Sequence, residues 1–178
     1  MQTVTYRLAD SLPRSIYDKV IADAVDDAAR RRHLDATIDE GRGACLLRDP
    51  RHAAIVREAF EHFDGERYRL IAWVVMPNHV HVTVEQIYGF PIGDVIHAWK
   101  SFTAKAINKC RGANGAVWAP DYVDRVVRNE RHFANAIGYI ENNPVKAGLA
   151  RHPEDWPYSS AAGSAGGTPA VPGKSSHE

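Results

Sequence analysis

Two histidines separated by a single residue, His79 and His81, are the pair whose type and spacing most directly indicate chemistry. Val80, Val82 and Val84 occupy the alternate positions, which is typical of a strand with one apolar and one polar face. Residues two apart on a strand project to the same side. We therefore expect the two imidazoles side by side, where they can bind one divalent metal ion. The alternative is that both are merely histidines on the polar face of a strand.

A second pair, Tyr139 and Asn143, lies four residues apart on a predicted helix, so the two side chains share one face. At 100° per residue, Tyr139 lies about 120° from the apolar stripe of Phe133, Ile137 and Ile140. A tyrosine hydroxyl can attack phosphorus when a metal ion neutralises the phosphate. The carbonyl oxygen of Asn143 is a candidate third metal ligand. The alternative is a structural tyrosine at the edge of a packed helix.

The elements that must position these groups are strands and helices in mixed order. Alternation predicts a strand over 3–8, and an apolar, β-branched run predicts a central strand over 69–76. The turn signal Pro77-Asn78 makes this central strand an antiparallel neighbour of the histidine strand. Helices are predicted over 11–32, 49–64 and 93–110 and from about 129 to Pro144, with a turn at 38–43 and a loop at 112–120.

Composition is that of a globular protein, with 178 residues, 44% hydrophobic and 25% charged. We predict one folded domain over 1–158 and a disordered Ser/Gly/Pro-rich tail over 159–178. The N-terminal residues do not resemble a signal peptide, so a cytoplasmic location is expected. The two cysteines, Cys45 and Cys110, lack metal-ligand spacing and are expected to be small buried residues.

The net charge of zero argues mildly against a nucleic-acid-binding protein, because such domains are usually basic. The charge is uneven, however. Segment 95–128 holds six lysines and arginines against two aspartates, a local charge of +4. This segment is either a phosphate-binding surface or an ordinary solvated helix face.

Four segments carry a specific resemblance, namely 73–82 (WVVMPNHVHV), 99–103 (WKSFT), 139–149 (YIENNPVKAGL) and 156–160 (WPYSS). Together they resemble the REP-associated tyrosine transposases, a family of single-tyrosine HUH transposases. The similarity runs in order from about Val4 to Ser160. It implies an α+β fold of the HUH nuclease type (ferredoxin-like or RRM-like), in which helices pack on an antiparallel sheet.

The resemblance also implies an activity, the cleavage of single-stranded DNA beside a hairpin through a 5′-phosphotyrosine intermediate. His79 and His81 would bind the metal, expected to be Mg²⁺ or Mn²⁺, and Tyr139 would be the nucleophile. Asn143 stands where better-known relatives have a glutamine ligand, one methylene longer. Glu85 is a second candidate ligand because it lies on the histidine face of the strand, although the family does not point to it. The partner would be single-stranded DNA with a REP-like hairpin, bound by a monomer or a homodimer. The residues predicted to contact DNA are Lys100, Lys105, Arg125 and Arg128 for phosphates and Trp118 and Tyr122 for bases.

Two other functions are compatible with the same residues. One is a metal-dependent hydrolase that uses activated water, in which Tyr139 is only structural. The other is a non-catalytic regulator that binds DNA hairpins. A covalent protein–DNA product would distinguish the nicking and joining enzyme from both.

Overall fold

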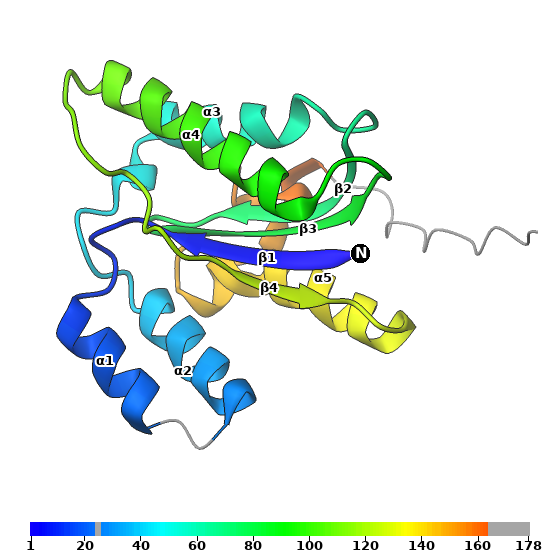
Figure 1. The fold of residues 1–178 in the computed structure, drawn as a ribbon, viewed down its shortest axis with the longest axis horizontal. Coiled ribbons are helices and arrows are strands. Elements are labelled where there is room, and N and C mark those ends of the chain that lie inside the picture. Colours follow the sequence, from blue (N-terminus) through cyan, green and yellow to red (C-terminus); the bar gives the residue numbers. More distant parts are fainter. Residues whose placement is uncertain (24–25, 164–178) are drawn as a thin grey trace, which may run out of the picture.

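The computed structural model describes residues 1–23 and 26–163. Four strands form one sheet in the order β2-β3-β1-β4, and every neighbouring pair is antiparallel. The predicted α+β class, an antiparallel sheet with packed helices, is confirmed (Figure 1). The elements are β1 (Gln2–Arg7), α1 (Arg14–Asp23), α2 (Asp27–Asp39), a 3₁₀ turn (Leu46–Arg48), α3 (Pro50–Glu61), β2 (Tyr68–Val75), β3 (His79–Gln86), α4 (Ile92–Cys110), β4 (Val123–Val126), α5 (Glu130–Lys146) and two 3₁₀ turns (Pro153–Asp155 and Ser160–Gly163).

The alternation along β3 separates two hydrophobic cores, one on each face of the sheet. The three valines of β3 belong to a core shared with α3 and α4, which cover one face of the sheet (Figure 1). On the other face α5 packs through Phe133, Ile137 and Ile140 against Ala72 and Val74 of β2. The face of β3 that carries the histidines is therefore the face that α5 covers.

Strand β2 lies at an edge of the sheet and not at its centre, which corrects the prediction for 69–76. Both of its faces are covered, and its outer edge is closed by the chain that follows α5. The backbone N–H of Val75 donates to the carbonyl of Tyr158 (2.8 Å), and Trp156 Nε1 donates to the carbonyl of Val75 (3.0 Å). A covered edge strand has the same apolar pattern as a central one.

The fold continues past the boundary expected at 158. Ser159 pairs with Val74, Ser160 Oγ accepts from the backbone N–H of Trp73 (3.1 Å), and Ala161 is buried. Residues 159–163 thus pack against β2. The rest of the predicted tail, 164–178, lies outside the described residues.

The single helix predicted over 11–32 is in fact two helices, α1 and α2. The carboxylate of Asp26 accepts the backbone N–H of Ala29 (2.6 Å) and caps the start of α2. This helix then runs through part of the predicted turn and ends at Asp39. Gly41 follows with φ of 69°, a conformation that glycine adopts without strain.

Other local predictions also need correction. Strand β4 was missed, because only four residues pair with β1 and most of them are exposed. Pro144 does not end α5, which continues to Lys146. Cys45 is buried as expected, but Cys110 is exposed.

In the part of the chain described here, no helix has the length and apolar character needed to cross a membrane.

Candidate active site

His79 and His81 lie side by side on β3, as the spacing predicted. Each is 1% exposed, their ring centroids are 4.7 Å apart, and the two Nε2 atoms are separated by 3.1 Å. Two nitrogen atoms that approach so closely inside a protein need either a shared proton or a shared cation between their lone pairs.

The orientation of His79 is fixed by the side chain of Asn78. Asn78 Nδ2 donates to the carbonyls of Ile38 (3.0 Å) and Arg42 (3.1 Å), so its Oδ1 must face the imidazole. His79 Nδ1 lies 2.7 Å from that oxygen. Because a carbonyl oxygen can only accept, Nδ1 carries the proton and Nε2 keeps its lone pair. Asn78 therefore presents Nε2 as a metal ligand and ties it to the end of α2.

His81 is held from the other side by β1. Its Nδ1 lies 2.7 Å from Thr5 Oγ1, across the register that pairs Thr5 with His81. Burial lowers the pKa of His81 well below the usual value, and the neighbouring His79 and Arg125 lower it further. The imidazole is therefore neutral at neutral pH, which is the form that binds metal.

Asp39, at the end of α2, joins the two histidines. Its Oδ1 lies 3.3 Å from Nε2 of His79, and this oxygen is buried without a hydrogen-bond partner among the described residues. The ligand atoms of the three residues all lie within 4.8 Å of one another. Two atoms bound to one ion at about 2.0–2.2 Å each lie roughly 3 Å apart, and the 3.1 Å between the two Nε2 atoms and the 3.3 Å from Asp39 Oδ1 to His79 Nε2 fit this spacing. The chemistry fits too, since one carboxylate and two neutral imidazoles form a common ligand set for divalent metals.

The sequence did not point to Asp39. It lies forty residues before His79, in a segment whose composition predicts a turn. No regular spacing in the sequence links Asp39 to His79. The other candidate, Glu85, pairs instead with Arg69 (3.3 Å) and is absent from the cluster.

Asn143, the predicted third ligand, is 1% exposed on α5. Both atoms of its amide are buried without a hydrogen-bond partner in residues 1–23 and 26–163. Buried amides are normally satisfied, so this side chain has unused capacity to bind an ion or a water molecule. Because α5 does not break at Pro144, Asn143 lies within the helix, one turn beyond Tyr139.

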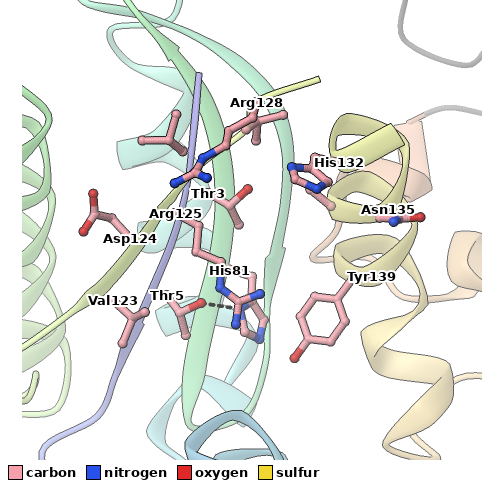
Figure 2. Close-up of a pocket in the computed structure, with 13 residues that line it drawn as sticks. Thr3, Thr5, His81, Val123, Asp124, Arg125, Arg128, His132, Asn135 and Tyr139 are labelled. Carbon is pink, nitrogen blue, oxygen red and sulfur yellow. Dashed lines mark hydrogen bonds between the residues drawn. The ribbon is translucent and has the colours of Figure 1, made fainter. Parts of the chain in front are cut away.

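Tyr139 faces the histidine pair from α5. Its ring centroid lies 5.2 Å from that of His81, with the planes at 78°. Figure 2 shows the tyrosine extending from α5 toward His81 on β3. Both line a cleft of about 590 Å³ between α5 and the β1–β4 edge of the sheet. Other residues around the cleft are Thr3, Thr5, Asp124, Arg125, Arg128, His132 and Asn135.

The structure separates the six predicted DNA contacts into two groups. Arg125 and Arg128 line the same cleft as Tyr139 (Figure 2). The other four, Lys100, Lys105, Trp118 and Tyr122, are not among the residues that line it. The missed strand β4 is what brings Arg125 to the site, because it pairs with β1 at the open edge of the sheet.

Two members of the second group have structural roles. Lys100 Nζ donates to the carbonyls of Ala119 (2.6 Å), Pro120 (3.0 Å) and Asp121 (3.3 Å), which occupies its ammonium. Trp118 is buried, and its Nε1 donates to Thr103 Oγ1 (2.9 Å). The ring of Trp118 packs in the core, so little of it is left to stack on bases.

The remaining two, Lys105 and Tyr122, are exposed. Tyr122 lines a separate hollow that is bordered by Lys100 and Trp118. Lys105 lies on α4, which covers the face of the sheet opposite α5 (Figure 1). Neither is placed near Tyr139 by a contact in the described chain.

Comparison with known proteins gives the family. Residues 47–143 match the model of the family described as "Transposase IS200 like". The chain belongs to this family. The matched segment contains His79, His81, Tyr139 and Asn143 but not Asp39.

Two curated relatives are REP-associated tyrosine transposases. One, from Escherichia coli (strain K12), is 31% identical over 94 residues, which cover 52% of this chain and 53% of the relative. The other, from Haemophilus influenzae, is 27% identical over 118 residues, covering 58% and 63%. The chain thus spans between about half and two thirds of the length of these relatives.

A solved structure of a REP-associated tyrosine transposase bound to a REP hairpin has the same fold. Its TM-score is 0.59 at 21% identity, over 89% of this chain and 74% of that one.

Proposed function

We propose that this protein is a metal-dependent enzyme that nicks and joins single-stranded DNA, with Tyr139 as the nucleophile. The observation that carries the proposal is the position of Tyr139. Its ring faces His81 of a buried histidine pair, in a cleft that also contains Arg125 and Arg128. A phenol, a cluster of metal ligands and two cations around one cleft suit the transfer of a phosphoryl group.

In the forward step the Tyr139 hydroxyl oxygen forms a bond to phosphorus, and the bond from phosphorus to the 3′ oxygen breaks. The phenol loses its proton, and the departing 3′ oxygen gains one. The fragment on the 3′ side of the cut is then held on the tyrosine through its 5′ phosphate, as a phosphodiester, and the other fragment ends in the 3′-hydroxyl. Attack of a 3′-hydroxyl on this link reverses the step, so joining needs no nucleotide cofactor.

His79, His81 and Asp39 would hold the ion, with Asn143 as a further candidate ligand on α5. A bound Mg²⁺ or Mn²⁺ would supply positive charge to the phosphate oxygens, which prefer a hard ion. Arg125 and Arg128 would bind phosphates of the strand. The helix fixes Tyr139 relative to His81, which serves the positional precision that catalysis requires.

The proposed substrate is a DNA hairpin with a single-stranded flank. The solved relative with this fold is described as bound to a REP hairpin, and the arginines of the cleft offer contacts to a phosphate backbone. Affinity for such a hairpin should exceed that for blunt duplex of the same length and should fall as salt rises.

The decisive experiment uses a labelled hairpin oligonucleotide, Mn²⁺ and a denaturing gel. The wild-type protein should give a covalent adduct, and Tyr139→Phe should give none while still binding the hairpin. Tyr122→Phe is the matched control, because it removes one hydroxyl from an exposed tyrosine outside the cleft, and it should keep the adduct. A cut strand without an adduct would favour the hydrolase, and binding without cutting would favour the regulator. Peptide mapping of the adduct to Tyr122 would refute the assignment.

A further inference from the structure

A second hollow runs along α5 next to the cleft. It encloses about 480 Å³ and shares Asn135 and Tyr139 with the cleft, so the two hollows meet at the proposed nucleophile. A strand that lies in both must therefore pass over Asn135 or Tyr139. Its other lining residues are Ala134, Gly138, Asn142, Val145 and Lys146, and we call this hollow the α5 groove.

Lys146 supplies a cation to the α5 groove. Its Nζ lies 4.7 Å from the centroid of the Tyr139 ring, and the side chain is exposed. Within the described residues its ammonium forms no ion pair, in contrast to Lys100, whose donors are occupied by carbonyls. Positive charge thus lies on both sides of Tyr139, with Lys146 in the groove and Arg125 and Arg128 in the cleft.

Gly138 leaves the surface of α5 open between these charges. It lies in the interior of the helix, where glycine is less favourable than alanine. Its backbone does not have a positive φ, and a Cβ atom there would meet no atom within 4 Å. Neither conformation nor packing accounts for the glycine. A missing side chain does, however, let a ligand approach the helix closely beside Tyr139.

We propose that the α5 groove binds the phosphodiester backbone of the single strand on one side of the scissile phosphate. Lys146 binds a phosphate oxygen, and Gly138 provides the room for the sugar–phosphate chain. The cleft with Arg125 and Arg128 takes the flank on the other side. This proposal rests on the proposed function, because it assumes that the strand is cut at Tyr139.

The test measures binding in a Tyr139→Phe background, so that no substrate is consumed. The probe is a hairpin oligonucleotide with a single-stranded flank on each side, because phosphate contacts do not depend on sequence. Loss of one phosphate contact to a single strand lowers the log–log salt slope by about 0.7, which at 0.1 M salt is about a fivefold weaker affinity. Lys146→Gln should show both changes. The control is Lys109→Gln, an exposed lysine in the last turn of α4, and it should show neither.

Trimming the probe locates the contact. Removing one of the two flanks should abolish the difference between Lys146→Gln and its parent, and removing the other should preserve it. If the salt slope of Lys146→Gln equals that of the parent, or if the difference survives both trimmings, the proposal is wrong.

Gly138→Ala provides a second test that misfolding cannot imitate. It should raise the melting temperature, because alanine favours the helix, and yet weaken binding of the flanked hairpin. If this variant binds as tightly as its parent, the strand does not lie in the α5 groove. A variant that carries Lys146→Gln and keeps Tyr139 separates the two proposals, because it can still form the covalent adduct. An adduct with unchanged salt dependence would refute the groove alone, whereas no adduct in the wild type would refute the proposed function.

Discussion

Replacement of Asn78 tests how the site is connected to the fold. This 1% exposed amide makes three hydrogen bonds, two from Nδ2 to the carbonyls of Ile38 and Arg42 and one from His79 Nδ1 to Oδ1. The first two hold the end of α2 against the turn before β3. The third orients a metal ligand. One side chain thus links the stability of the domain to its metal affinity.

The expected magnitudes for Asn78→Ala follow from these bonds. Each net hydrogen bond contributes about 1 kcal/mol, and a buried group left without a partner costs about 1–3 kcal/mol. Water can replace the amide at the partly buried carbonyl of Arg42 more easily than at Ile38. We therefore expect unfolding in urea with EDTA to show a loss of about 3–4 kcal/mol. Loss of the group that orients a ligating histidine lowers metal affinity by about 10–100-fold.

Asn78→Asp separates the two effects. Its carboxylate still accepts from His79 Nδ1, but the second oxygen faces two carbonyls and repels them. Stability should fall at least as far as in Asn78→Ala. Metal affinity is measured by calorimetry in an Asp39→Asn background, so that displacement of α2 does not contribute. In that background Asn78→Asp should retain the metal affinity and Asn78→Ala should lose it. Equal losses of metal affinity in the two variants, or a stability change below about 1 kcal/mol in Asn78→Ala, would refute this account.

Other predictions concern the ligands and the residues reassigned to structural roles. His79→Ala/His81→Ala, or excess EDTA, should abolish cleavage while leaving much of the hairpin binding, and full activity in either would exclude the metal site. In calorimetry, Asp39→Asn should lower metal affinity more than Asn143→Ala does, because the Asp39 carboxylate already lies beside His79. The opposite order would make Asn143 the principal third ligand. Lys100→Met should cost about 1–3 kcal/mol of stability and leave the salt slope of DNA binding unchanged, whereas a reduced slope would restore Lys100 as a phosphate contact. Trp118→Phe should lose about 1 kcal/mol with its hydrogen bond to Thr103, and weaker DNA binding at unchanged stability would contradict its place in the core.

The sequence predicted those parts of the site that depend on short-range periodicity. The shared face of His79 and His81 follows from the two-residue repeat of a strand. The position of Tyr139 beside the apolar stripe of α5 follows from the helical repeat. These regularities are local, so tertiary packing had only to preserve them.

The remaining parts depend on contacts between distant segments. Asp39 lies beside the histidines at the end of α2, which Asn78 binds, and no local pattern encodes that bond. Arg125 reaches the cleft because four residues of β4 pair with β1, too few to give a clear alternation. Trp118 lies in the segment predicted as a loop, but this loop passes over the core. There the Trp118 ring packs against Tyr6, and its Nε1 donates to Thr103 Oγ1. In each case the position of the side chain was decided by a partner distant in the sequence and not by the residue itself.

The arrangement also explains how a chain of zero net charge can offer a site for DNA. The cations of the proposed contact surface are few: Arg125 on β4 and Arg128 after it line the cleft, and Lys146 at the end of α5 lines the α5 groove. Arg125 has two effects there, because it lies in the cleft that the strand would occupy and also lowers the pKa of His81. Burial is the largest cause of the lowered pKa of His81 and His79 the second, and Arg125 adds to them. Within the cleft Arg125 and Arg128 outnumber Asp124, so the local charge is positive although the total is zero. Net charge is for this reason a poor guide to DNA binding when the contact surface is as small as this cleft.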